Sequence, residues 1–228
     1  MAVLLAIFGN LWIYKIAQLS LVYFLVVAGT SFAFAKHTRF FTITTFVLLV
    51  SIQIINFEPI NLTELSNDEV RVRDERLSIY PTELLQIGYY LDAKPEVLVT
   101  RKIINGVIRQ FDPNIYFFAG HPRERIGVAE FEKFPYILLP VFLVGVYKAL
   151  KGRKLILALF IIPTIINAFN KNSHLDFALL PFFSTTIYLG LVQSIKLAEK
   201  FKYKNYLYFL FAIIYLLVMI QIISYEIS

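Results

Sequence analysis

Three side chains that can bind an anion stand close together in this sequence: His121, Arg123 and Arg125. They follow an aromatic run, 116–118, of the kind found at membrane–water interfaces. An Arg guanidinium binds phosphate oxygens through a planar, two-pronged fork. The pattern therefore predicts a site for a lipid-borne phosphate. The alternative is that the two arginines pair with acidic neighbours or contact lipid headgroups without specificity.

A second polar group, Lys171, His174 and Asp176, lies between two apolar segments. Lys171 and His174 would extend the phosphate site if folding brings the two groups together, although His174 alone also suits a polar cap at the end of a span. Asp176 falls just inside an apolar segment, where a carboxylate is costly and functional by default. It either pairs with Lys171 or His174 or acts as a catalytic acid or base. Asp112 is the other candidate for that role.

Several other kinds of site are excluded by composition and spacing. The chain has no cysteine, which excludes disulfides, Cys-ligated zinc and thiol nucleophiles. Its three histidines, at 37, 121 and 174, are scattered and lack metal-ligand spacing. Neither a Gly-rich phosphate loop nor an HExxH motif occurs in the sequence. We therefore expect no metal ion and no other cofactor.

The elements that position these residues must be largely apolar. Of the 228 residues, 58% are hydrophobic, 16% are aromatic and 17% are charged, and the mean hydropathy is +0.66. Soluble domains have about 25% charged residues. This composition excludes a disordered chain, argues against a soluble enzyme and against nucleic-acid binding, and indicates an integral membrane protein, which we expect in the plasma membrane.

The charges divide the chain into three parts. Residues 58–134 hold 13 acidic and 10 basic residues, whereas all the rest hold 3 acidic and 12 basic residues, so the formal net charge of +6 combines −3 with +9. We therefore predict N-terminal membrane helices over 1–57, an insert over 58–134 and a C-terminal four-helix membrane block over 135–228.

The apolar parts break into segments near the roughly 20 residues that a helix needs to cross a bilayer. These segments predict an all-α polytopic membrane protein with about six transmembrane helices and a mostly helical extracytoplasmic insert. The expected spans are 16–35, 40–57, 135–150, 155–170, 175–195 and 206–224. Residues 1–14 are too short to cross alone and form a partial span, an interfacial helix or part of a long helix with the next segment. A cleaved signal peptide is the competing interpretation of the start.

Basic clusters predict the orientation of these spans. Lys36 and Arg39, the cluster 151–154 and the four lysines of 196–204 fall on one side if spans alternate. Cytoplasmic loops are enriched in Lys and Arg. The insert and the loop 171–174 should therefore be extracytoplasmic.

Two further patterns concern the helices themselves. Pro140, Pro163 and Pro181 fall in three successive expected spans and could kink them to open a cavity near the outer face, or could simply reflect how common Pro is in membrane helices. Within the insert, 81–91 and 95–111 are predicted to be helices. The second is amphipathic and should lie along the membrane surface, or pack against the insert. Residues 70–73 alternate briefly like a strand, although no partner strand is evident.

Three segments resemble C-type polytopic glycosyltransferases of the dolichyl-phosphate-mannose protein mannosyltransferase-like kind. The aromatic and Gly-containing segment 112–121 resembles one that precedes a Leu-Pro-containing span in that family. Here that span begins Leu139-Pro140-Val141, and a later outer loop leads through His174 to Leu180-Pro181-Phe182. The resemblance covers about 101–191. It implies an enzyme that takes a sugar from a polyprenyl-phosphate carrier at the outer face.

Two departures from that family matter for activity. The Arg that usually follows the outer-loop His is absent, and Asp176 stands nearby instead. The family keeps its catalytic carboxylate in the first outer loop of a longer N-terminal half, whereas this sequence has no acidic residue before Glu58. The chain therefore resembles the C-terminal part of such an enzyme.

Three function classes follow from these observations. The first is a glycosyltransferase-like membrane protein, whole or partial, that binds a polyprenyl-phosphate sugar through His121, Arg123, Arg125, Lys171 and His174, with Asp112 and Asp176 as acid or base candidates. Replacing Arg123 and Arg125 by Ala should then abolish lipid-phosphate binding. The second is a non-catalytic subunit that completes a bundle with a second polytopic membrane protein. The third, a transporter or channel, lacks the expected internal repeat.

Overall fold

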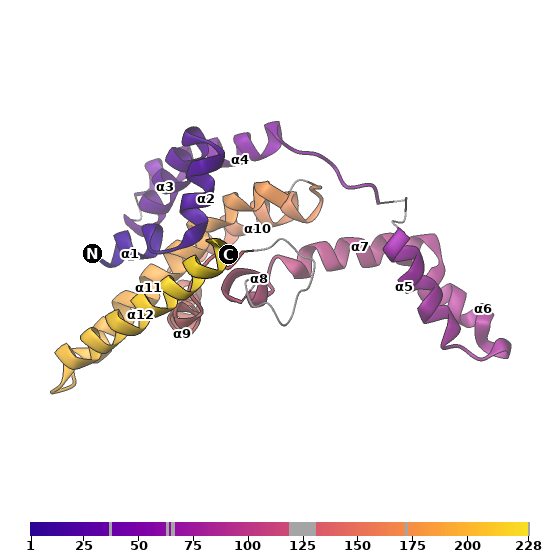
Figure 1. Cartoon of the computed structure of the whole chain (residues 1–228). Coiled ribbons are helices and arrows are strands. Elements are labelled where there is room, and N and C mark those ends of the chain that lie inside the picture. The colour runs from indigo at the N-terminus through magenta and orange to yellow at the C-terminus, as the bar shows by residue number, and fades with distance from the viewer. Residues whose placement is uncertain (37, 63, 65–66, 119–130, 172, 228) are drawn as a thin grey trace.

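The computed structural model describes residues 1–36, 38–62, 64, 67–118, 131–171 and 173–227 (Figure 1). The described residues form helices and turns, and the β-type contact found among them is an isolated bridge between Pro59 and Asn170. The prediction of an all-α fold is confirmed. The strand-like alternation at 70–73 lies within helix α5 (Asn67–Ser78), so it forms no strand.

Each expected span corresponds to a helix. The six helices are α3 (Leu21–Lys36), α4 (Arg39–Ile55), α9 (Leu139–Gly152), α10 (Lys154–Ala168), α11 (Leu180–Ala198) and α12 (Lys204–Ile227). Within the described chain, two segments are long and apolar enough to cross a membrane, Asp176–Ala198 and Lys204–Ser224. The bent pair α1 (Ala2–Phe8) and α2 (Leu11–Leu19) would make a third. A membrane protein is supported, and the count of six spans stays a prediction.

The N-terminal residues form two short helices with a bend of 57° between them. Asn10 stabilises the bend because its side chain accepts a hydrogen bond from Ile13 N at 3.0 Å and donates one to Ile7 O at 2.9 Å. Tyr215 of α12 donates a hydrogen bond to the carbonyl of Gly9 at the same place. Ser20 then separates α2 from α3. Residues 11–14 therefore belong to the same helix as 15–19, and the expected span 16–35 is divided at Ser20 between α2 and α3.

Helices α9 and α11 pack so closely that each needs a glycine at the contact. A Cβ on Gly145 would lie 1.8 Å from the carbonyl oxygen of Thr186. A Cβ on Gly190 would lie 1.9 Å from the carbonyl oxygen of Val141. Small residues at such contacts let two helix backbones approach in a membrane, where lipid provides no hydrophobic drive for helix association.

Of the two interpretations of the three prolines, kinks in three successive helices are not supported at two of the positions. Pro140 and Pro181 lie in the first turns of α9 and α11. A first-turn Pro disturbs little, because the N–H that it lacks would have no partner within the helix. Pro163 alone among the three lies inside its helix, α10.

One end of the bundle is held by Arg153, which lies between α9 and α10. Its guanidinium donates to the carbonyl oxygens of Phe34 at 2.7 Å and of Ala35 at 3.4 Å. The basic cluster 151–154 therefore lies beside the C-terminal end of α3, as the charge alternation predicted. Which side of a membrane this end faces stays a prediction.

The insert forms a helical arm that projects from the bundle. Figure 1 shows α5 and α6 at the far end of the arm and α7 leading back toward α8 and α10. The arm contains α5, η1 (Thr82–Leu84), α6 (Leu85–Gly88), the π-helical turn η2 (Tyr89–Ala93), α7 (Pro95–Arg109) and α8 (Pro113–Phe117). Both helices predicted in the insert form, the first as short irregular pieces. Helix α7 contacts α10 closely, since a Cβ on Gly106 would lie 2.6 Å from Ala168 O.

Candidate functional site: a cationic cavity

A cavity of about 760 Å³ lies where the arm joins the bundle. Its walls come from α2, the chain at 60–61, α7, α8, Phe131, Lys133, the end of α10 and the residues Asn170, Lys171 and Asp176. These segments are far apart in sequence. The cavity therefore exists only because the insert folds back onto the bundle.

The cavity wall is strongly cationic. Among the described lining residues, five are basic and one is acidic. They are Lys15, Lys102, Arg109, Lys133 and Lys171, with Asp176 as the carboxylate. Such a concentration of one sign of charge in a concave site attracts anions and stabilises them once bound. A phosphate oxyanion suits this wall better than any cation or neutral group does.

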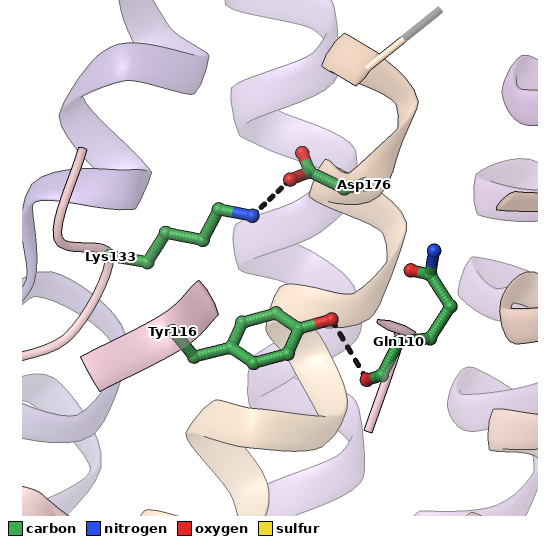
Figure 2. Close-up of polar contacts among 4 residues, drawn as sticks. All are labelled: Gln110, Tyr116, Lys133 and Asp176. Carbon is green, nitrogen blue, oxygen red and sulfur yellow. Dashed lines mark hydrogen bonds and ion pairs between the residues drawn. The ribbon is translucent and has the colours of Figure 1, made fainter. Parts of the chain in front are cut away.

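The most buried of these cations, Lys133, forms an ion pair with Asp176 (Figure 2). The Lys133 side chain is 9% exposed, whereas the Asp176 side chain is 26% exposed. The prediction that Asp176 pairs rather than stands alone therefore agrees with the structure. The partner differs from Lys171 and His174, the two residues that sequence proximity suggested, because 131–133 folds against η4 (Ser173–Leu179), the short helix that carries Asp176.

Two aromatic rings also hold the Lys133 ammonium. Its Nζ lies 4.7 Å from the ring centroid of Trp12 and 4.9 Å from that of Tyr116, both within cation–π range. The Tyr116 hydroxyl donates to Gln110 O at 3.0 Å, which fixes that ring (Figure 2). Phe134 N donates to Tyr116 O at 2.8 Å, so the chain that carries Lys133 is tied to α8.

The preceding residue, Glu132, is 8% exposed and points to a different partner. Its Oε1 accepts a hydrogen bond from the backbone N–H of Tyr136 at 3.1 Å. Burial raises the pKa of Glu132 from 4.5 to about 7, and the hydrogen bond from Tyr136 lowers it in part. Adjacent residues at this end of the bundle therefore carry a buried cation and a buried carboxyl group.

Two predicted site residues line the cavity. Lys171 lies on the wall, and its backbone N–H donates to Glu58 O at 2.7 Å, which ties this loop to the start of the insert. Asp176 lies on the wall through its pair with Lys133. His174 belongs to the same short helix as Asp176, but its side chain falls outside the described part.

The other predicted site residues are not brought to the cavity wall in the described structure. Asp112 caps helix α8, where its side chain accepts from Asn114 N at 2.9 Å, and it is not a lining residue. A cap of this kind is structural. His121, Arg123 and Arg125 lie outside the described residues.

Sequence reasoning missed four of the five lining cations: Lys15, Lys102, Arg109 and Lys133. Lys133 carried a usable signal, because it stands between Phe131, Phe134 and Tyr136 directly before an expected span. A lysine among aromatics at that depth has both an interface and cation–π partners at hand. Lys102 and Arg109 fall seven residues apart on α7, two helical turns, and therefore share a face.

Comparison with known proteins gives no family assignment. Protein-family models, curated proteins and solved structures were each compared with the chain, and no match was found. Within the described residues, no group of three or more His, Cys, Asp or Glu side chains is placed to hold a metal ion. The functional argument therefore depends on the cationic cavity itself.

Proposed function

We propose that this chain is a glycosyltransferase-like membrane protein that binds the phosphate of a polyprenyl-phosphate-linked sugar in the cationic cavity. The observation that carries the proposal is the convergence of five basic side chains, from segments far apart in sequence, on one cavity with a single described carboxylate. A phosphate diester carries one negative charge and a monoester up to two, and both have several acceptor oxygens, which matches an excess of cationic donors. The quoted motifs of C-type polytopic glycosyltransferases favour a sugar-linked phosphate.

The apolar surroundings support a lipid as the carrier of that phosphate. Only 17% of the Lys204–Ser224 segment is buried, so α12 presents most of its apolar side chains outward. On α7, Ile104 and Ile108 are 49% and 60% exposed, close to the cationic residues of the same helix. A ligand with an anionic head and a long hydrocarbon chain could contact the cationic cavity with its head and the exposed apolar side chains with its chain.

The proposed topology places the cavity on the extracytoplasmic side of the plasma membrane. The opposite end of the bundle carries Arg153 and its basic neighbours, which the distribution of Lys and Arg in membrane proteins assigns to the cytoplasm. Six spans would then put the arm and Lys171 outside. In this arrangement the cavity cations would hold the phosphate that leaves when the sugar is transferred.

Binding of three probes to the full chain in detergent tests the proposal. We expect geranyl phosphate to bind, geraniol to bind much more weakly, and inorganic phosphate to bind at higher concentration than geranyl phosphate. Replacing both Lys15 and Lys171 by Ala should weaken the binding of geranyl phosphate without changing the binding of geraniol. Equal binding of geranyl phosphate and geraniol would show that the cavity does not recognise phosphate.

One observation favours a second candidate, a non-catalytic subunit. Asp176 is the sole carboxylate among the described lining residues, and it is paired with Lys133, so it is poorly placed to act as a base. A second polytopic chain would then supply the catalytic carboxylate. Co-purification of such a chain, with sugar transfer only by the pair, would establish this alternative, whereas transfer by the isolated chain would exclude it.

A further inference from the structure

The Lys133–Asp176 pair differs from an ordinary structural ion pair in how its two partners are held. Lys133 is fixed by two aromatic rings, at 4.7 and 4.9 Å, as well as by the carboxylate. In the part of the chain that the structure describes, the Asp176 carboxylate makes one polar contact, the bond from Lys133. The ammonium would therefore keep its place without Asp176, whereas the carboxylate depends on the ammonium.

The rings around Lys133 are themselves rigid. Trp12 is 2% exposed and lies edge-on to Phe134, with ring centroids 5.8 Å apart. Tyr116 is 1% exposed and its hydroxyl is bound to a backbone carbonyl. Two buried rings with negative π-faces form a fixed cation-binding position, and this position does not require a neighbouring anion.

Asp176 is the more accessible partner and lies on the cavity wall. Its side chain is 26% exposed against 9% for Lys133, and it lies at the start of the helical segment Asp176–Ala198. A phosphate that enters the cavity meets this carboxylate beside the buried ammonium. The phosphodiester of a polyprenyl-phosphate sugar carries one negative charge, as a carboxylate does, whereas a monoester such as geranyl phosphate carries up to two. The ligand's advantage over Asp176 is therefore that its phosphate oxygens can also reach some of the four further cations that line the same cavity.

We propose that the Asp176 carboxylate occupies the place that a phosphate oxygen of the ligand takes, and that the ligand displaces it from Lys133. Asp176 is then a positioning residue that neutralises Lys133 in the empty cavity and competes with the ligand for it. Lys133 is the buried anchor of the anion. This inference depends on the proposed phosphate-binding function and adds to it the identity of the anchor and the reason for a carboxylate in a cationic site.

The proposal makes an unusual prediction for Asp176→Asn. Removing the competing charge should tighten geranyl phosphate binding by ~tenfold, since one like charge at contact distance in a partly buried site is worth at least that factor. Lys133→Met should weaken binding by at least about tenfold, and the double variant should bind more weakly than Asp176→Asn, because the anchoring ammonium is lost. Asp176→Glu, which keeps the carboxylate, should bind like the native chain.

The single tryptophan of the chain, Trp12, provides the measurement. Because the Trp12 ring lies against the Lys133 ammonium, Trp12 fluorescence should change when a phosphate binds that ammonium. Geranyl phosphate, inorganic phosphate and geraniol are titrated into the full chain in detergent, with Asp74→Asn on the distant helix α5 as the control for loss of a carboxylate. Thermal melting of each variant checks that it is folded.

The outcomes separate this inference from the proposed function. Tighter binding by Asp176→Asn, for both phosphates and not for geraniol, supports the inference. If the native chain binds geranyl phosphate and folded Asp176→Asn binds it equally or more weakly, the competitor role is overturned while the phosphate site stands. If neither the native chain nor any variant binds geranyl phosphate more tightly than geraniol, both proposals fail together.

Discussion

The two ends of the bundle both carry buried or half-buried basic residues, but they use them differently. At one end, Arg153 donates to the carbonyls that end helix α3, at 2.7 and 3.4 Å, so its charge stabilises a helix terminus. At the other end, Lys133 is surrounded by rings and a carboxylate on the wall of a cavity that four more cations share. The first arrangement satisfies one cation with backbone carbonyls. The second places five cations around a cavity, and one of them, Lys102, also donates to backbone carbonyls, those of Asn61 at 3.2 Å and Glu64 at 2.7 Å.

This contrast shows that the role of a basic residue in a membrane protein follows from its contacts and not from its position in the sequence alone. Both ends contain several Lys and Arg residues, and their distribution along the sequence predicts only which of them share a side of the membrane. From the contacts we propose a structural role for the charges at one end and a binding role for those at the other. The following variants test that assignment.

Lys133→Met should have the largest effect. It leaves the partly buried Asp176 carboxylate without its cation, and breaking such a pair costs about 3–5 kcal/mol of stability. It should also remove most phosphate binding. Chemical denaturation of the full chain in detergent measures the first effect and Trp12 fluorescence the second. A variant with native stability and native phosphate affinity would remove Lys133 from the site.

Glu132 provides a pH test of the same end. Its pKa is about 7 in the folded chain against 4.5 as a free residue, so between these values the unfolded state releases a proton that the folded state keeps. Stability should therefore fall as pH rises from about 4.5 to about 7, by up to ~3 kcal/mol, and change little from this group above that range. Glu132→Gln, whose amide oxygen can still accept from Tyr136 N–H, should lack this decline in melts from pH 4.5 to 8.5.

Arg153→Met should separate the two ends most directly. Loss of charged hydrogen bonds to the α3 carbonyls should cost about 1.5–3 kcal/mol of stability. Geranyl phosphate affinity of the folded variant should stay native, because Arg153 lies at the end away from the cavity. Lys154→Met, which removes an exposed neighbouring charge, is the matched control and should change stability by less than about 0.5 kcal/mol. Reduced phosphate affinity in Arg153→Met alone would contradict the division between the ends.

Lys171→Ala should have the smallest effect. Lys171 is an exposed residue of the cavity wall, so we expect unchanged stability and a several-fold loss of geranyl phosphate affinity, corresponding to about 1 kcal/mol. The loss should shrink as salt is raised, since exposed charges are screened within about 8–10 Å at physiological ionic strength. Lys200→Ala, an exposed lysine after α11, is the control and should leave affinity unchanged at every salt concentration.

Much of the fold was predictable because it depends on local properties. Six apolar segments form six helices, and the two predicted helices of the insert also form, since apolar length and helical periodicity act within one segment. The prolines were misread for a local reason: Pro140 and Pro181 fall in first turns, and helix boundaries are the least certain part of a pattern. The meeting of Gly145 with Gly190 could not be predicted, because it requires knowing which helices are neighbours.

The candidate site shows the same division. Lys171 and Asp176 are both predicted site residues and both line the cavity, whereas their roles in phosphate binding and catalysis stay predictions. Pairing of Asp176 is one of the two alternatives that the sequence left open, but its partner is Lys133 and not Lys171 or His174. The Lys133–Asp176 pair joins residues 43 apart in sequence, and the two aromatic rings that contact Lys133 come from α2 and α8. Asp112 is a candidate acid or base in the sequence, and in the structure its carboxylate caps helix α8, while a role in catalysis stays a prediction.

The sequence by itself determined that the chain is helical and apolar and that its charges lie at two ends, because hydrophobicity and charge are properties of each segment alone. The tertiary structure decided what those charges do. Folding the arm onto the bundle brings Lys15, Lys102, Arg109, Lys133 and Lys171 to one cavity, while Arg153 meets the carbonyls of α3. The physical reason is that a cation's role depends on the partners within a few ångströms of it, and those partners come from segments that only folding brings together.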